Sequence, residues 1–221
     1  MKSLRSLPGV SSVGAGSALP PRTAQRGTQF DIAGRTFAEK EDRSAYFVAA
    51  TPGLFATLRT RVVEGREFSD TDRADAPRVA IVSQSLARRL FPDATALGRR
   101  LRVLNPDDKP DWREIVGIVQ DVRYSGLEDP GENAIYTPFA QTPFMWAYVF
   151  VRSGAPASTL APSIADAVRR VHPALVAADV RPMEGLVSAS VAGSRFQAAL
   201  LSSFAVLALL LSALGLYGLV S

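Results

Sequence analysis

The last stretch of the chain, residues 198–221, contains no Asp, Glu, Lys or Arg. As an α-helix, its 24 residues would rise about 36 Å, enough to cross the roughly 30 Å hydrocarbon core of a bilayer. A buried helix or hydrophobic hairpin of a soluble domain is the alternative, but such a helix needs only one apolar face. The pattern therefore predicts a transmembrane helix, which we place at residues 196–221.

The composition of this segment suggests what it contacts. The small residues Ala208, Ser212, Gly215 and Gly218 recur at helical spacing, which would allow a second transmembrane helix to approach closely. Small residues are also common in membrane helices generally, so both interpretations stay open. No basic residue follows the segment, and we expect the chain to be a piece of a larger membrane protein.

Composition excludes several classes of function. The 221 residues include no cysteine and one histidine, His172, which rules out a thiol nucleophile, a disulfide framework and a multi-histidine metal centre. The net charge is +4, yet the basic residues are spread along the chain between acidic neighbours. The densest group, Arg99, Arg100 and Arg102, is interpreted as a solvated strand or turn, so we expect no nucleic-acid partner.

Residues 1–195 show the short, irregularly alternating elements typical of an α+β fold. Thr51 and Ser83 are candidate N-caps of two helices, and a third helix is expected at residues 160–171 after Thr159. Residues 29–37 favour a hairpin. The expected strands are residues 10–15, 45–50, 79–82, 96–104, 114–122, 134–138, 146–151 and 178–181.

Two of these strands carry further information. Residues 114–122 are apolar on both faces and should be central in a sheet, with Gly117 marking a bulge or a close backbone approach. Residues 134–138 are expected to form a short edge strand. From residue 148 to residue 181 the order strand, helix, strand is a βαβ-type unit of the split ferredoxin-like kind.

No catalytic, cofactor-binding or metal site is predicted. Asp70, Asp72 and Asp75 approach the spacing of a cation loop, but the glycine and terminal glutamate of an EF-hand are missing. A solvated turn is the favoured interpretation, and a metal-dependent enzyme at this loop is the least favoured hypothesis. There is no phosphate-binding P-loop, and His172 suits a helix end better than a catalytic role.

An aromatic row precedes the third helix. Trp146, Tyr148 and Phe150 alternate, so they share one face of an expected strand. Such a row is more often sheet core than a ligand-binding surface. If it were a contact surface, the chain would be a membrane-anchored binding or scaffold domain.

Four segments in order resemble one known family: residues 46–101, 114–127, 135–141 and 194–221. Within them stand the motifs TPGLF, EGREF, VAIVSQSLARRLFP and EIVGIVQDV. Together they are similar to the periplasmic core domain of MacB-type ABC transporter permeases, running into the first helix of an FtsX-like membrane module. The resemblance is strongest to the branch whose permeases are often internally duplicated and carry no fused ATPase.

The resemblance implies a fold and a place in the cell. It implies a core domain at residues 1–195, made of a porter-like βαβ (split ferredoxin-like) lobe and a mixed α/β lobe inserted at about residues 66–139. The transmembrane helix would follow at residues 196–221. The domain would lie on the periplasmic side of a bacterial inner membrane.

The resemblance also implies partners and a function. The partners would be a second permease copy or the missing half of the same permease, a cytoplasmic ABC ATPase, and other efflux-system components. The chain would transmit ATP-driven helix movement to export or efflux of a substrate. It would not itself be an enzyme and would need no cofactor.

Overall fold

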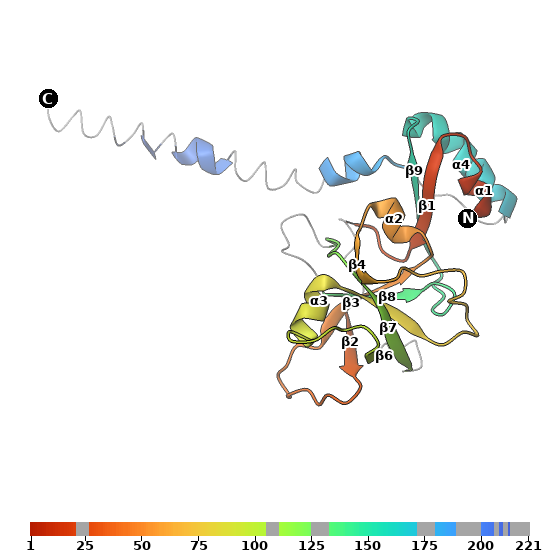
Figure 1. The fold of residues 1–221 in the computed structure, drawn as a ribbon. Helices are drawn as coiled ribbons and strands as arrows, with labels where there is room; N and C mark the ends of the chain where they lie inside the picture. The colour runs from red at the N-terminus through yellow and green to blue at the C-terminus, as the bar shows by residue number, and fades with distance from the viewer. Residues whose placement is uncertain are drawn as a thin grey trace, which may run out of the picture. The chain divides into compact units, whose positions relative to one another are not determined.

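The structure is a computed structural model that describes residues 1–20, 27–104, 111–124, 133–171, 180–188, 200–205, 208–209 and 212. The chain divides into two compact units, Met1–Val180 and Arg181–Ser221. The first unit holds the helices and strands described below (Figure 1). The expected limits of the core domain at residue 195 and of an inserted lobe at residues 66–139 remain predictions.

The described elements are short. The helices of the first unit are α1 (Lys2–Arg5), α2 (Leu54–Leu58), α3 (Gln84–Leu90) and α4 (Ala157–Val171). The strands are β1 (Val10–Gly16), β2 (Gly27–Ile32), β3 (Ser44–Ala50), β4 (Val62–Gly65), β5 (Val79–Ser83), β6 (Arg100–Leu104), β7 (Trp112–Val119), β8 (Ala134–Pro138) and β9 (Tyr148–Ser153). The mixed α and β content expected from the sequence is confirmed.

Six strands close into a barrel. They follow one another in the order β2, β6, β7, β5, β8 and β3, and β2 pairs with β3 to close the ring. The pairs β3–β8 and β5–β7 are parallel, and the other four pairs of the ring are antiparallel. Closure removes exposed sheet edges. β4 pairs with β7 outside this ring.

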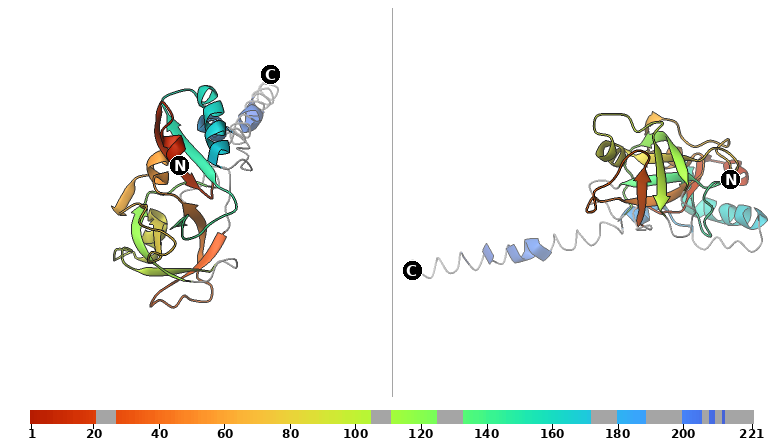
Figure 2. Two further views of the ribbon diagram at one scale, coloured as in Figure 1. Left: turned by 90° about the vertical axis from the view of Figure 1, so that its right-hand side faces the viewer. Right: turned by 90° about the horizontal axis from the view of Figure 1, so that it is seen from below.

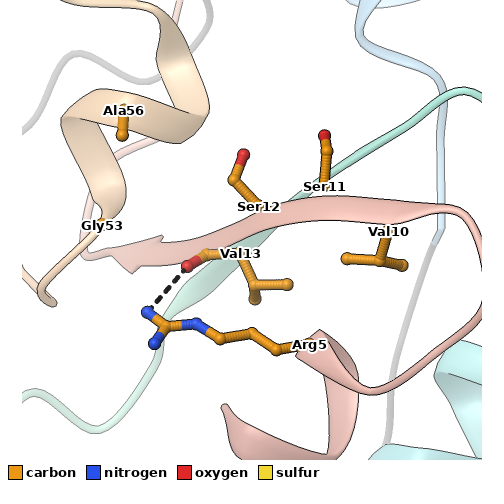
Figure 3. Close-up of a pocket in the computed structure, with 7 residues that line it drawn as sticks. All are labelled: Arg5, Val10, Ser11, Ser12, Val13, Gly53 and Ala56. Atoms are coloured by element: carbon orange, nitrogen blue, oxygen red, sulfur yellow. Dashed lines mark hydrogen bonds between the residues drawn. The ribbon is translucent and has the colours of Figure 1, made fainter.

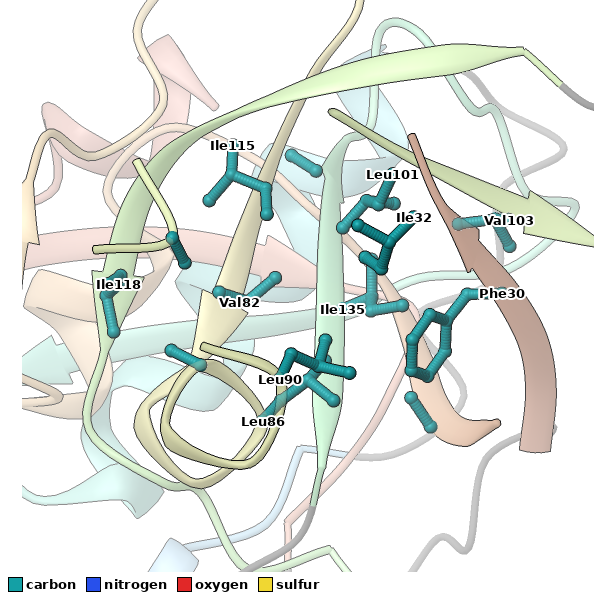
Figure 4. Close-up of a cluster of buried hydrophobic side chains, with 14 of the residues drawn as sticks. Phe30, Ile32, Val82, Leu86, Leu90, Leu101, Val103, Ile115, Ile118 and Ile135 are labelled. Atoms are coloured by element: carbon teal, nitrogen blue, oxygen red, sulfur yellow. The ribbon is translucent and has the colours of Figure 1, made fainter. Parts of the chain in front are cut away.

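The barrel interior is filled by residues from all six strands of the ring, together with one face of α3 (Figure 4). In β5, for example, Ala80 and Val82 point inward, as the two-residue period of a strand requires. We call this set the inner cluster: Phe30, Ile32, Ala45, Phe47, Ala80, Val82, Leu86, Ala87, Leu90, Ala96, Leu101, Val103, Ile115, Ile118 and Ile135.

The opposite faces of four barrel strands build a second core. We call this set the outer cluster: Ala18, Val48, Ala50, Leu54, Phe55, Phe68, Val79, Ile81, Val119, Tyr124, Ala134 and Tyr136. β7 is central, as expected, because it pairs with β4, β5 and β6. The prediction that residues 134–138 form an edge strand is wrong, since β8 lies between β3 and β5 and all five of its residues are buried.

The remaining elements of the first unit form a small lobe. β1 and β9 are antiparallel neighbours, and α1 and α4 pack beside them (Figure 2). Leu4, Val13 and Ala167 form its buried apolar cluster, which we call the small-lobe cluster. Of the closing strand expected at residues 178–181, only Val180 and Arg181 are described, and neither is in a strand. The strand–helix–strand order is therefore seen only as far as α4. One residue pair, Gly16 with Ala50, joins β1 to β3 of the barrel.

Several local predictions need correction. Residues 29–37 are not a hairpin, because β2 ends at Ile32 and pairs with β3 and β6 instead. Thr51 does not cap a helix: Gly53 is the N-cap of α2 and Pro52 precedes it. Thr159 lies inside α4, which begins two residues earlier. Ser83 does cap α3, accepting from the Leu86 amide at 3.4 Å.

The C-terminal prediction falls largely outside the described residues. Among those that the structure describes, no helix is both long enough and apolar enough to cross a membrane. Ala208 and Ser212 are helical, whereas Gly215 and Gly218 lie outside the described part. Their packing role therefore stays a prediction.

A candidate coupling site at helix α2

Helix α2 lies where the barrel and the small lobe meet (Figure 1). It has five residues and is bounded by left-handed backbone at Gly53 (φ 85°) and Arg59 (φ 60°). Leu54 and Phe55 are each 1% exposed and belong to the outer cluster. We call the contacts that residues 51–60 make with α1, β1 and β9 the α2 seam.

A carboxylate binds the N-terminal end of α2. Glu67, two residues after β4, accepts hydrogen bonds from the amides of Gly53 (2.9 Å) and Phe55 (3.3 Å). Burial raises the pKa of Glu67, although these two amide hydrogen bonds act in the opposite direction. A negative group suits this end, where helix amides have no partner within the helix.

A guanidinium binds the other end. Arg152 of β9 donates from Nε and Nη2 to the Thr57 carbonyl, at 2.9 and 2.6 Å. Carbonyls of the last turn lack partners within a helix, and a cation is favourable there. The two ends of α2 are thus held by charged side chains of opposite sign, one beside the barrel and one in the small lobe.

β1 and α1 complete the seam. An added Cβ on Gly14 of β1 would lie 2.4 Å from the Leu54 Cα, so only glycine permits this approach. The Thr51 hydroxyl accepts from the Ala15 amide at 2.7 Å and donates to its carbonyl at 3.2 Å. Arg5 of α1 reaches the Pro52 carbonyl at 3.3 Å. Three of the four small-lobe elements, α1, β1 and β9, therefore contact this one segment.

A depression of about 230 Å³ lies beside the seam (Figure 3). Its lining comes from α1, β1 and the α2 segment: Arg5, Val10, Ser11, Ser12, Val13, Gly53 and Ala56. Arg5 crosses it to bond the Val13 carbonyl at 3.4 Å. The depression is a consequence of the seam, because its walls come from the small lobe and from the α2 segment that contacts it.

The motifs that carry the family resemblance meet one another in space. TPGLF and EGREF are joined by the Glu67 bonds to the amides of Gly53 and Phe55. VAIVSQS and EIVGIVQDV are joined because Asp121 accepts from the Ser85 amide at 2.9 Å and its hydroxyl at 2.5 Å. The motifs therefore join separate elements of the fold to one another.

Gly117 behaves as the sequence predicted. A Cβ there would lie 2.2 Å from the Arg66 carbonyl oxygen, and the β5–β7 register shifts between Ala80 and Ile81, opposite this part of β7. Gly65 has φ +72° and would place a Cβ 2.3 Å from the Val116 carbonyl oxygen. Both the bulge and the close backbone approach are confirmed.

The acidic loop is a braced turn. Asp72, 6% exposed, accepts two bonds of 2.8 Å from Arg66 and one of 2.8 Å from the Ser69 amide. Burial alone would raise the pKa of Asp72, but the Arg66 and Ser69 bonds outweigh it and leave this pKa lowered. Asp70 and Asp75 are exposed. Within the described residues no group of three acidic, His or Cys side chains could hold a metal, and His172 lies outside them.

The aromatic row is divided. Trp146 precedes β9, is 53% exposed and contacts the Phe144 ring at 6.1 Å between centroids. Phe150 lies within β9 and packs against the outer cluster. The core interpretation holds for Phe150 but not for Trp146, whose neighbour Met145 is 97% exposed.

The two charged residues that bind the ends of α2, Glu67 and Arg152, were missed by the sequence reasoning. Glu67 stands in the EGREF motif, which was noticed without a role being assigned. Arg152 is the first charged residue after the uncharged run 133–151, and an isolated charge at the end of such a run is the signal that could have drawn attention to it.

Comparisons with known proteins agree with this architecture. The family described as MacB-like periplasmic core domain matches residues 4–171. The macrolide export ATP-binding/permease protein MacB of Marinobacter nauticus is 28% identical over 98 residues, which is 44% of this chain and 14% of that protein. The chain thus spans a small part of this relative.

Two solved structures share the fold. The extracellular domain of the noncanonic ABC-type transporter YknZ from Gram-positive bacteria has a TM-score of 0.50 and 21% identity, covering 78% of this chain and 80% of that one. The periplasmic region of MacB from Actinobacillus actinomycetemcomitans has a TM-score of 0.54 and 13% identity, covering 78% and 72%. Because the family match extends over more than half of the residues, the chain belongs to the MacB-like periplasmic core domains.

Proposed function

We propose that this chain is the extracytoplasmic part of an ABC transporter permease, and that the α2 seam carries movement between its small lobe and its barrel. Family membership supports the first part. The observation that carries the second is that α2 is bonded at one end by Glu67 beside the barrel and at the other by Arg152 of the small lobe. A helix that is hydrogen-bonded to a different lobe at each end can transmit a displacement of one lobe to the other.

The topology suggests where movement would enter. α1 and α4, the first and last elements of the matched region, both belong to the small lobe and contribute Leu4 and Ala167 to its cluster. Membrane helices connected to these elements would therefore move the small lobe first, and the barrel would follow through the seam. On this proposal a cytoplasmic ABC ATPase drives the movement, and export or efflux of a substrate is the result.

The remaining predicted features belong to the same proposal. The chain would lie at a bacterial inner membrane with a transmembrane helix at residues 196–221, packed through Ala208, Ser212, Gly215 and Gly218. Its partners would be a second permease copy or the other half of the same permease, and further efflux components. Bond chemistry would be left to the ATPase.

The location can be tested by cysteine labelling. The sequence has no cysteine, so Ser158→Cys on the exposed side of α4 gives one reporter in this region. A membrane-impermeant maleimide should label it in intact spheroplasts, whereas Ala167→Cys, 1% exposed, should react only after denaturation. Labelling of Ser158→Cys only after lysis would contradict the proposed location.

A membrane-anchored binding domain is the second candidate, and the exposed side chains of Met145 and Trp146 favour it. Affinity purification of the intact permease separates the two. Recovery of an ABC ATPase whose hydrolysis rate changes with permease variants of the seam supports transport. Purification without any ATPase, together with a ligand lost in Trp146→Ala, supports the binding domain.

A further inference from the structure

We infer that α2 is a helix that the two lobes form jointly, and that Arg152 is the positioning residue by which the small lobe keeps it folded. Without the hydrogen bonds from Arg152, α2 unfolds locally, and the small lobe and the barrel move independently. The consequence for transport rests on the proposed function, whereas the state of the helix does not.

The length of α2 is the first reason. Its five residues, Leu54–Leu58, are far fewer than the roughly 12–15 that an isolated helix needs to be even marginally stable in water. A helix leaves amides and carbonyls unpaired at its ends. Some of these pair locally in α2, as the Leu54 amide does with the Thr51 carbonyl, but the Phe55 amide and the Thr57 carbonyl take side-chain partners from elsewhere in the chain. The stability of α2 must therefore come from its surroundings.

The origin of those partners is the second reason. Glu67 follows β4, which pairs with β7 of the barrel, and supplies an acceptor for two N-terminal amides. Arg152 belongs to β9, which pairs with β1 in the small lobe, and supplies two donors to one C-terminal carbonyl. Each lobe thus supplies the charged side chain that binds a different end of the same helix.

The apolar contacts are distributed in the same way. The side chains of Leu54 and Phe55 pack into the outer cluster on the barrel. The backbone of Leu54 lies against Gly14 of β1. Withdrawal of the small lobe would expose this backbone and leave the buried Thr57 residue, 3% exposed, without its guanidinium partner.

Arg152 is the single side chain on which to test this. Its hydrogen bonds to the Thr57 carbonyl, at 2.9 and 2.6 Å, join β9 directly to α2. Arg152→Met keeps an unbranched apolar side chain and removes both donors, whereas Arg152→Lys restores a cation with a single point of contact. Arg43→Met is the matched control, because Arg43 bonds Asp31 at 3.0 Å and joins no element of the small lobe through that bond.

The experiment is hydrogen–deuterium exchange on the intact permease in lipid nanodiscs. In Arg152→Met, amide protection in residues 54–60 should fall at least about tenfold, as expected for lost hydrogen bonds to a charged group. Protection of β5 and β7 should stay unchanged. Arg152→Lys should recover part of the loss, and Arg43→Met should leave α2 unaffected.

Two results would overturn the inference. One is unchanged protection of α2 in Arg152→Met. The other is an equal loss of protection in β5, β7 and α2, since Arg152 would then support the whole fold and not this helix.

A second comparison tests joint formation. Glu67→Gln weakens the other end of α2, and two independent supports should give additive losses of protection. If both lobes are needed to form α2, the helix is already unfolded in either single variant. The double variant Glu67→Gln/Arg152→Met should then lose clearly less protection than the sum of the two single losses. Additive losses of protection would contradict joint formation. If α2 opens as expected while nucleotide hydrolysis and transport stay normal, the proposed function fails and the inference about the helix stands.

Discussion

The barrel and the small lobe differ in how completely each can bury its own apolar surface. The inner cluster has 15 buried residues, contributed by all six barrel strands, α3 and Ala96 of the loop between α3 and β6, whereas the small-lobe cluster has three. Burying a large aliphatic or aromatic side chain contributes about 1.5–3 kcal/mol. The barrel can therefore maintain itself, and the small lobe depends on its neighbours for order.

This difference has a consequence for the seam between them. When a stable lobe is joined to a less stable one, the less stable lobe can change conformation while the stable one keeps its structure. Local opening is favoured where few apolar contacts are buried. We therefore expect movement in this domain to be concentrated in the small lobe and α2.

The largest expected effect contrasts the two cores. Phe30→Ala removes a ring that is 0% exposed in the inner cluster and should lower the free energy of unfolding by about 3–5 kcal/mol. Leu4→Ala, 6% exposed in the small-lobe cluster, should cost about 2 kcal/mol, at the low end for its type, and only locally. Urea unfolding measures the global loss of stability in both variants, and hydrogen exchange shows where protection is lost. Equal losses of global stability in Phe30→Ala and Leu4→Ala would contradict the difference between the two cores.

The second effect concerns two glycines whose added Cβ atoms would meet backbone. Gly117→Ala would place Cβ 2.2 Å from the Arg66 carbonyl oxygen, and Gly14→Ala would place it 2.4 Å from the Leu54 Cα. Each should cost about 1–3 kcal/mol. Exchange in Gly117→Ala should rise across β4 and β7, whereas Gly14→Ala should loosen α2 alone. A barrel disturbed by Gly14→Ala would remove the distinction between the two regions.

Sequence reasoning was most successful where local chemistry decides the structure. The cap at Ser83 and the close approach at Gly117 depend on residues near in sequence or on the absence of a side chain. The hairpin at residues 29–37 failed because the partners of β2 are β3 and β6, and the closure of a barrel is not visible in local alternation. Glu67 and Arg152 were missed for the same reason: their partners, Gly53 and Thr57, lie 14 and 95 residues away.

Position within an element also limited the sequence reasoning. Thr51 and Pro52 look like a helix start, but the Thr51 hydroxyl is used across the seam by Ala15. Phe150 was correctly assigned to the core because it alternates within β9. Trp146 was grouped with it, although the strand begins only at Tyr148.

A smaller effect tests the braced turn on the barrel side. The lowered pKa of Asp72 means that its contribution is present above its unfolded value, about 3.9, and is lost as the pH falls through the folded value. Asp72→Asn should cost about 1–2 kcal/mol at pH 7 and flatten the acid limb of a stability–pH profile. Asp70→Asn, at an exposed site, is the control and should change neither. An unchanged acid limb in Asp72→Asn would show that the Arg66 pair contributes nothing.

The smallest effect is expected at Trp146. Its 53% exposed ring lies before β9, so Trp146→Ala should change the unfolding free energy by less than about 1 kcal/mol. Phe150→Ala, whose ring packs on the outer cluster, should cost clearly more. Thermal unfolding of the two variants decides between an exposed contact residue and a core residue; similar large losses would place both rings in the core.

The most direct measurement is hydrogen exchange of the intact permease, purified with its ATPase, in the nucleotide-free state and with ATP trapped. Movement carried through the seam predicts that exchange changes in residues 51–60 and in β9, while β5 and β7 of the barrel keep the same protection in both states. Identical exchange across α2 and β9 in the two states would contradict transmission through this helix.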